Sequence, residues 1–350
     1  MDNTVAVLEK PGKMVIKSIP VVEPKNDELL IKIAQVSICG SDMHGFQFGP
    51  YLPPKDPNTI VELGHEAAGI VIKVGSNVKN FKEGDRVAVE PGIPCGKCEF
   101  CRTGHYNVCP NVDFLATAPN YKGALTNYIT HPAEWTHHLP DSMSLVEGAL
   151  VEPASVGVHA IEAGGNVVGK SIVILGSGAV GLFATMVARL SGANKIVVVD
   201  VLENRLKKAR EVGATATFDG RDKDIVEKVK KIVGPYGADL VYETAGAVPT
   251  AKLGLQLVKW TGTFFIVGTI PDEVSVDFLK INREVTVRTL FRYCNDYEKT
   301  INLIESGKLN VLGITDKYFD YKNIQEAFDF AVNHKSDFLK GVITVDGSLK

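Results

Sequence analysis

Residues 171–188 read Ser-Ile-Val-Ile-Leu-Gly-Ser-Gly-Ala-Val-Gly-Leu-Phe-Ala-Thr-Met-Val-Ala, and this stretch decides the fold class. Its first five residues form an apolar run rich in β-branched side chains, which is typical of a buried strand. Three glycines interrupt the run, and a helical pattern then continues towards Ser191-Gly192. A second apolar run, 196–199, closes on Asp200. Strand, glycine-rich turn, helix and strand in this order predict a parallel, doubly wound α/β sheet.

The glycine-rich turn indicates binding of a dinucleotide. Gly176 permits a tight turn, Gly178 lets a pyrophosphate approach the backbone, and Gly181 lets the helix pack closely on the strand. The N–H groups at the helix N-terminus then face the phosphates. Asp200 can bond the ribose hydroxyls of NAD while it repels the 2′-phosphate of NADP. We therefore expect NAD as cofactor; a membrane span over 171–188 is disfavoured because the glycines break it.

The composition is that of an ordinary globular protein, with 23% charged and 45% hydrophobic residues in a chain of 350. This length is enough for two domains with full cores. A formal net charge of −3 gives no basic surface for nucleic acid or anionic lipid. No secretory signal precedes the strand-like residues 5–8, so we expect a cytoplasmic protein whose clustered cysteines bind metal.

The pattern of elements changes along the chain. Strand candidates at 29–33, 70–74 and 86–89 make the first part β-rich. From about residue 155, strands alternate with helices, among them a helix expected at 249–260. A last strand, 341–345, is expected to rejoin the first domain. We therefore predict a β-rich domain of residues 1–154 and 293–350, and a nucleotide-binding domain of residues 155–292.

Four cysteines lie within fifteen residues, at Cys95, Cys98, Cys101 and Cys109. Such a cluster predicts a closed tetrahedral site for structural zinc. Two alternatives are disulfides, which a reducing compartment disfavours, and an iron–sulfur cluster, but seven residues precede the last cysteine where the bacterial pattern has three. We expect the zinc to pin a loop. The sixth cysteine, Cys294, is expected to be a small buried residue.

Three further segments, 39–44, 64–66 and 152–153, carry a thiol, an imidazole and carboxylates. These groups can together form a zinc site with a position open for substrate. Because a single His or Glu is more often solvated or internally bonded than a metal ligand, the spacing alone does not establish the site.

The chain as a whole resembles the zinc-containing medium-chain dehydrogenases and, among them, the sorbitol (L-iditol) and related polyol dehydrogenases. The resemblance is carried by Ile38-Cys39-Gly40-Ser41-Asp42, Gly64-His65-Glu66, Val89-Glu90-Pro91-Gly92, the four-cysteine lobe, residues 150–153 and 155–159, the glycine-rich turn, Arg283-Glu284 and Phe291-Arg292-Tyr293-Cys294. It implies a GroES-like catalytic domain, a Rossmann domain that binds NAD, and a homodimer or homotetramer.

The resemblance also implies the roles of individual residues. Cys39, His65 and Glu66 are implied to bind the catalytic zinc, and Glu152 is either a fourth ligand or holds the zinc-bound water. The implied proton relay consists of Ser41 and His44, and the implied contacts to substrate hydroxyls are Arg292 and Tyr293. The candidate cofactor-binding residues are Gly176, Gly178, Ala179, Val180, Gly181, Asp200, Arg205, Val267 and Gly268.

We therefore expect a zinc- and NAD-dependent polyol dehydrogenase, which oxidises a secondary alcohol of a sugar alcohol to a ketose. A threonine 3-dehydrogenase or a 2,3-butanediol dehydrogenase is the alternative, since those enzymes share the zinc and cofactor residues. The segment 291–293 favours a polyol. A non-catalytic NAD- or zinc-binding protein is disfavoured, because every ligand and relay residue is present.

Overall fold

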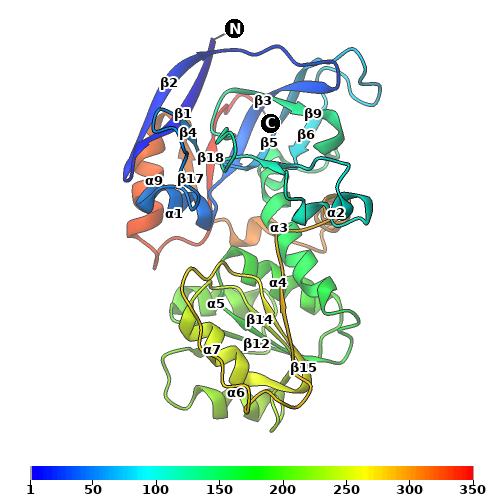
Figure 1. Ribbon diagram of the computed structural model, residues 1–350, viewed down its shortest axis with the longest axis vertical. Helices are drawn as coiled ribbons and strands as arrows, with labels where there is room; N and C mark the ends of the chain where they lie inside the picture. Colours follow the sequence, from blue (N-terminus) through cyan, green and yellow to red (C-terminus); the bar gives the residue numbers. More distant parts are fainter. Residues whose placement is uncertain (1, 350) are drawn as a thin grey trace. The chain divides into compact units, whose positions relative to one another are not determined.

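The computed structural model describes residues 2–349, and the chain divides into two compact units (Figure 1). Unit 1 comprises Met1–Glu152 and Tyr297–Lys350, and unit 2 comprises Pro153–Asp296. The helix α3 (Leu145–Ala163) contains the point of division. Sequence analysis did not predict this helix, because Pro153 lies inside it and a proline normally interrupts a helix.

Unit 1 is built mainly of antiparallel strands. Its larger sheet has the order β10-β6-β5-β3-β18-β17, with β9 also paired to β3, and a smaller sheet has the order β2-β1-β4. The strands are β1 (Asp2–Lys10), β2 (Lys13–Pro20), β3 (Glu28–Ser37), β4 (Val61–Glu62), β5 (Glu66–Val74), β6 (Arg86–Val89), β7 (Gly92–Ile93), β8 (Asp113–Phe114), β9 (Tyr128–Pro132), β10 (Thr136–His138), β17 (Lys317–Asp320) and β18 (Gly341–Thr344).

The sheet of unit 1 joins segments from both ends of the sequence. As expected, the last strand, β18, belongs to unit 1, and there it pairs antiparallel with β3, for example Val342 with Ser37. Leu29, Ile31 and Ile33 of β3 are fully buried, which explains the apolar character of that strand. The helices of this unit are α1 (Gly40–Phe48), α2 (Glu99–Arg102), α8 (Tyr297–Glu305) and α9 (Ile324–Asn333), with 3₁₀ turns η1 (Tyr106–Val108), η2 (Ala133–Trp135), η3 (Val311–Ile314) and η4 (Tyr321–Asn323).

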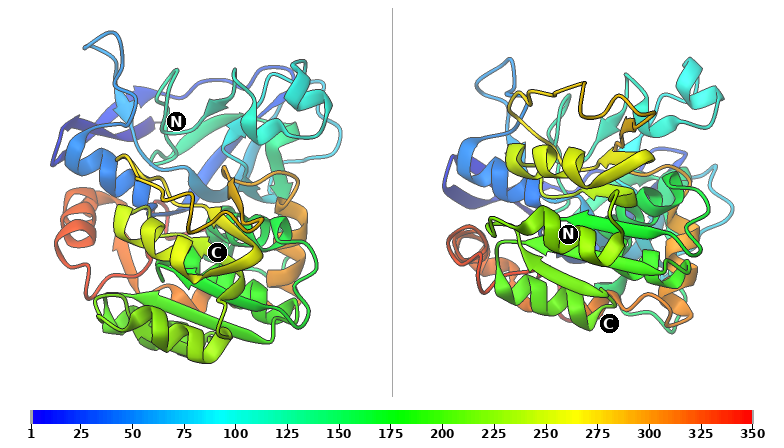
Figure 2. Two further views of the ribbon diagram at one scale, coloured as in Figure 1. Left: turned by 60° about the horizontal axis from the view of Figure 1, so that its bottom comes forward. Right: turned by 90° about the horizontal axis from the view of Figure 1, so that it is seen from below.

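Unit 2 has the predicted doubly wound parallel sheet, in the order β13-β12-β11-β14-β15-β16, with helices on both faces (Figure 2). The order reverses between β11 and β14, which is where such sheets bind ligands. Its strands are β11 (Ser171–Leu175), β12 (Lys195–Asp200), β13 (Ala216–Asp219), β14 (Ala238–Glu243), β15 (Val258–Ile266) and β16 (Thr286–Thr289), and its helices are α4 (Ala179–Leu190), α5 (Glu203–Glu211), α6 (Ile225–Val233) and α7 (Val248–Leu257).

One expected helix is shorter than predicted. We expected a helix over 249–260, but α7 ends at Leu257 and the strand β15 begins at Val258. Val258 and Trp260 are β-branched or aromatic residues that favour a strand, and Val258 pairs with Ala238 of β14 where the helix was expected to continue. Tertiary pairing therefore overrides the apolar spacing that suggested a longer helix.

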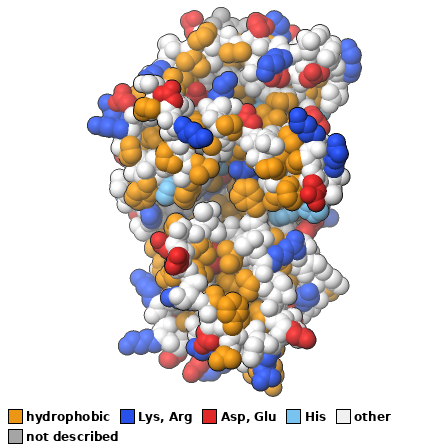
Figure 3. Space-filling view, in the orientation of Figure 1, with side chains coloured by type: hydrophobic (Ala, Val, Ile, Leu, Met, Phe, Trp, Pro, Cys, Tyr) orange, Lys and Arg blue, Asp and Glu red, His pale blue; other side chains and the backbone are white. Residues whose placement is uncertain are grey.

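The surface carries both signs of charge. On the face seen in Figure 3, lysine and arginine side chains alternate with aspartate and glutamate, without a broad area of one sign. Within residues 2–349, no helix combines the length and the hydrophobicity needed to cross a bilayer.

Candidate metal centres and active site

Three side chains of unit 1 bring metal-ligating atoms together. Cys39 immediately precedes α1, His65 precedes β5, and Glu66 is the first residue of β5. Their ligand atoms all lie within 4.8 Å of one another. His65 and Glu66 are only 6% and 1% exposed. A thiolate, an imidazole and a carboxylate fit zinc in a site with three protein ligands and one open position.

The backbone around Gly64 explains how His65 reaches this site. Gly64 has φ +86, and a Cβ there would lie 2.8 Å from Cγ of Leu125, so a side chain would be both strained and in collision. The Gly64 N–H donates to Oδ1 of Asp42 at 3.0 Å. The Cys39 N–H donates to the other oxygen of Asp42 at 3.1 Å. Asp42 therefore holds the two ligand segments together.

Asp42 also acts on His65 directly. Its Oδ1 lies 3.5 Å from Nδ1 of His65. Burial alone would lower the pKa of His65, but the Asp42 carboxylate and the Cys39 thiol group outweigh it and raise the pKa well above the usual value. A carboxylate beside a metal-binding imidazole fixes its orientation. Sequence analysis did not assign this role to Asp42, although it lies between Cys39 and His44 in a quoted motif.

Glu66 has two partners that bind the same oxygen. Ser37 Oγ and Lys340 Nζ both donate to Oε2 of Glu66. Lys340 also donates to the carbonyl oxygen of Ile38 at 2.9 Å. Lys340 lies 274 residues from Glu66 along the chain, so no local motif could have revealed the pair.

Glu152, Ser41 and His44, the other residues expected at the catalytic site, lie outside the group of three ligand residues. Glu152 is 6% exposed within α3 and is not a member of the three-ligand group. Ser41 is exposed in the first turn of α1, and His44 is partly exposed in the same helix. The His44 ring stacks on Tyr51, with centroids 3.8 Å apart and planes at 3°.

The four lobe cysteines form the second group of metal-ligating atoms. All their sulfur atoms lie within 4.8 Å of one another, and none is in a disulfide. Hydrogen bonds from the backbone of Lys97 and Cys98 lower the pKa of Cys95 to about 6, which favours the thiolate. The short ribbon β7–β8 closes the lobe by pairing Gly92 with Phe114. Four converging sulfur atoms fit a tetrahedral zinc ion.

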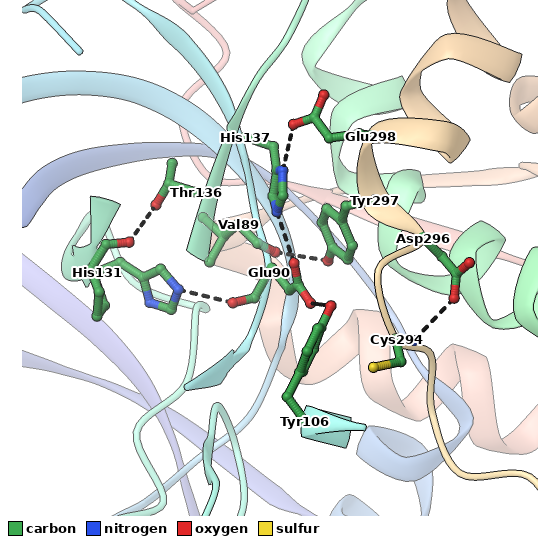
Figure 4. Close-up of polar contacts among 11 residues, drawn as sticks. Val89, Glu90, Tyr106, His131, Thr136, His137, Cys294, Asp296, Tyr297 and Glu298 are labelled. Carbon is green, nitrogen blue, oxygen red and sulfur yellow. Dashed lines mark hydrogen bonds and ion pairs between the residues drawn. The ribbon is translucent and has the colours of Figure 1, made fainter. Parts of the chain in front are cut away.

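The side chain of Glu90 connects the lobe to the sheet (Figure 4). Tyr106 in the lobe donates to Oε1 of Glu90 at 2.7 Å, and Nε2 of His137 lies 2.8 Å from Oε2. The opposite ring nitrogen of His137 lies 2.7 Å from Glu298. His131 Nε2 lies 2.9 Å from the backbone oxygen of Glu90 and therefore donates to it. The lobe is thus fixed at a buried carboxylate.

In unit 2 the glycine-rich turn has the predicted geometry. Gly176 has φ +100, and a Cβ on Gly181 would lie 2.0 Å from the carbonyl oxygen of Gly176. A Cβ on Gly178, the N-cap of α4, would meet only Nη1 of Arg205, at 3.9 Å. Nε of Arg205 is buried and has no hydrogen-bond partner among the described residues. Open space, a helix N-terminus and an unpaired cation donor fit a phosphate group.

Ala179 and Val180 form the first turn of α4 behind this space. Val267 and Gly268 follow β15, and both of their N–H groups donate to the backbone oxygen of Glu243. The Glu243 side chain is fully buried. Burial raises the pKa of Glu243, and this effect exceeds that of the hydrogen bonds to its carboxyl group, which lower the pKa. This carboxyl group holds the loop beyond β14, and sequence analysis did not identify it.

Asp200 lies where the fingerprint requires it, at the end of β12. One of its oxygens accepts from the N–H and hydroxyl of Ser177, and the other accepts from the N–H groups of Val201 and Leu202. A carboxylate offers about four acceptor positions. A ribose hydroxyl would therefore have to replace one of these partners.

The segment before α8 has an unusual backbone. Arg292 has φ +56, which is rare for a residue with a large side chain, and its guanidinium lies 4.5 Å from the Phe291 ring centre. Tyr293 is 3% exposed. Cys294, which we expected to be buried, is partly exposed; its N–H donates to Asp296, which holds it in a polar turn rather than in the core.

Two family models match the chain. Residues 25–141 match the alcohol dehydrogenase GroES-like domain, and residues 179–306 match the zinc-binding dehydrogenase domain.

Similar proteins extend over almost the whole chain. The uncharacterized zinc-type alcohol dehydrogenase-like protein YdjJ of Escherichia coli is 50% identical, over 99% of each chain. Sorbitol dehydrogenase of Bacillus subtilis is 39% identical, over 97% of this chain and 96% of its own. A solved structure from Sinorhizobium meliloti, bound to NADP, has a TM-score of 0.88 at 29% identity and covers 99% of this chain and 100% of its own.

Proposed function

The chain belongs to the zinc-type alcohol dehydrogenase family and is an oxidoreductase, and we propose that it oxidises a secondary alcohol of a polyol to a ketose, with NAD as hydride acceptor. The observation that carries the choice of a polyol is the 39% identity to sorbitol dehydrogenase of Bacillus subtilis over nearly the full length of both chains. The relative at 50% identity is uncharacterized and gives no substrate. The polyol is therefore proposed from the comparison with sorbitol dehydrogenase.

In the proposed mechanism, Cys39, His65 and Glu66 would hold the catalytic zinc, and Glu152 would either complete the ligand set or hold a water molecule. Zinc supplies Lewis acidity, which favours loss of the proton from a substrate hydroxyl. Ser41 passes that proton on, because a hydroxyl can donate and accept at once. His44, partly exposed in the same helix, releases it to solvent.

Unit 2 supplies the cofactor site in this proposal. The N-terminus of α4, with Ala179 and Val180, and the guanidinium of Arg205 would bind the pyrophosphate. Val267 and Gly268, which follow β15, would also contribute to the cofactor site. We propose NAD over NADP because the carboxylate of Asp200, at the end of β12, would repel a 2′-phosphate.

Domain roles, assembly and location complete the proposal. We propose that residues 1–154 and 293–350 form the catalytic domain and that residues 155–292 form the cofactor domain. The enzyme is proposed to act as a homodimer or homotetramer in the cytoplasm, where reducing conditions keep its cysteines as thiols.

The proposal is tested by following NADH absorbance with NAD⁺ and a panel of sorbitol, xylitol, ribitol, galactitol, threonine and 2,3-butanediol. We expect the protein to oxidise a polyol. Chelation should abolish this activity and zinc should restore it, and the Cys39→Ser variant should be inactive. If only threonine or butanediol is oxidised, the proposed polyol substrate is wrong and the proposed zinc-dependent oxidation stands. If no compound of the panel is oxidised although NAD⁺ binds, a non-catalytic protein is favoured.

A specific prediction concerns Arg292. Its positive φ marks a backbone held in place by its surroundings, as is frequent at functional sites. We expect Arg292→Ala to raise the polyol KM by about tenfold or more, as for a lost charged hydrogen bond, with little change in the KM for NAD⁺. Arg288→Ala, in the exposed strand β16, is the control. Equal loss for both substrates would assign Arg292 to the cofactor.

A further inference from the structure

Lys340 is the most unusual charged residue of unit 1. Its side chain is 2% exposed, and among residues 2–349 no other lysine or arginine is buried. Charged side chains are rarely buried to this degree unless they are paired. The ammonium group has two acceptors, the carbonyl oxygen of Ile38 and Oε2 of Glu66. The fold therefore places a buried ammonium group against Glu66, a residue of the candidate metal site.

The contacts of Glu66 divide its two oxygens. Both Ser37 and Lys340 donate to Oε2. Neither contact uses Oε1, so this oxygen is the one that Glu66 can offer with Cys39 and His65. The ammonium and the hydroxyl therefore occupy Oε2 and leave Oε1 without either contact.

The same contact changes the charge of the ligand set. With a thiolate at Cys39 and a carboxylate at Glu66, the set carries two negative charges, and Lys340 cancels one of them. A divalent ion held by such a set keeps more of its positive charge, and so polarises a substrate oxygen more strongly.

We propose that Lys340 is a positioning residue, which turns Oε1 of Glu66 towards the metal and gives up metal affinity in exchange for a more electrophilic site. This inference rests on the proposed function. The alternative is that Lys340 only fastens the start of β18 to the sheet, through its bond to Ile38. The two roles predict opposite changes in zinc affinity when the charge is removed.

The test measures the Kd for zinc at the catalytic site, by competition with a chelator, together with kcat and KM. For Lys340→Met we expect zinc to bind about tenfold more tightly, and kcat to fall about 10- to 100-fold with little change in KM. Lys340→Arg keeps the charge and should restore both values. The control is Lys32→Met, which breaks the partly exposed ion pair of Lys32 with Asp346, 2.5 Å apart, and leaves both values unchanged.

A charge-balanced pair of variants covers the case in which Lys340→Met does not fold. Glu66→Gln/Lys340→Met leaves no unpaired buried charge and keeps one net negative charge in the ligand set. Glu66→Gln alone keeps the same thiolate but also the Lys340 ammonium, so its net charge at the site is zero, and we expect the double variant to bind zinc more tightly.

Two results would overturn the inference. Weaker zinc binding in Lys340→Met, or in the double variant relative to Glu66→Gln, would refute the claim that Lys340 lowers metal affinity. Unchanged Kd and kcat in Lys340→Met would remove any role at the site. A wild-type protein that oxidises no alcohol would refute the proposed function, while the zinc affinities would still decide the role of Lys340.

Discussion

Two histidines contact the same glutamate, and their pKa values are shifted in opposite directions. His131 is buried beside the backbone oxygen of Glu90, and burial lowers its pKa to about 4. His137 lies between the carboxylates of Glu90 and Glu298. Burial alone would lower the pKa of His137, but these carboxylates outweigh it and raise the pKa. The two side chains should therefore respond to pH with opposite signs.

His131 should make the protein sensitive to acid. Since its folded pKa is below the ordinary value of about 6.5, its stabilising effect is complete above pH 6.5 and is lost as pH falls towards 4. The loss amounts to about 3 kcal/mol at most. Denaturant unfolding between pH 7.5 and 4.5 should show a steeper loss of stability in the wild type than in His131→Gln. Parallel pH profiles would contradict this.

His137 should act in the other direction. Its folded pKa is above the unfolded value, so its contribution is complete below about pH 6.5 and disappears as pH rises through the folded pKa. The difference in Tm between wild type and His137→Gln should be larger at pH 6 than at pH 9. His334→Gln, at an exposed position, is the control. A difference that is independent of pH would show that His137 stays neutral.

How well a site residue could be predicted depended on its distance from its partners in sequence. Cys39, His65, Glu66 and the lobe cysteines stand in short motifs, and the structure brings each set together; their roles remain proposals. Lys340 shows no local signal, because its partner Glu66 is 274 residues away. The two hydrogen bonds from Ser177 to Asp200 were also not predicted, because Ser177 lies 23 residues before Asp200 in the sequence.

At the scale of elements, strands with strong apolar runs were predicted well. The parallel sheet of unit 2 and the return of the last strand, β18, to unit 1 are as expected, whereas its pairing with β3 was not predicted. The strand β13 was missed because its residues, Ala216–Asp219, are all only partly buried and lack an apolar run. The end of α7 was misplaced because spacing alone does not register the pairing of β15 with β14.

The lobe should behave as an element that depends on its metal. Cys101→Ser removes one of four ligands, so we expect the protein to lose one zinc per chain and the lobe to exchange amide hydrogens faster. Metal analysis and hydrogen exchange over residues 95–109 measure both effects. Cys294→Ser, outside the cluster, should keep both zinc ions. Full zinc content in Cys101→Ser would contradict a structural site made of all four cysteines.

At the scale of the whole molecule, the edge strand β16 is a candidate interface between the subunits of the proposed oligomer. Strand β16 is the edge of its sheet, all four of its residues are exposed, and Val287 is 46% exposed. Such an edge can pair with the same edge of a second copy around a twofold axis. We expect Val287→Lys to shift the protein towards monomers in sedimentation velocity without lowering its Tm by more than a few degrees. Unchanged sedimentation would exclude this edge as the interface.

The position of β18 in the sheet has a consequence for synthesis on the ribosome. Unit 2 is translated in full before β18 and Lys340 leave the exit tunnel, so it can fold while the sheet of unit 1 still lacks the strand beside β3. During that interval Glu66 has no counter-ion from Lys340. A chain that ends between residues 296 and 340 therefore contains all of unit 2, but it lacks Lys340 and β18 and so leaves the candidate metal site of unit 1 incomplete.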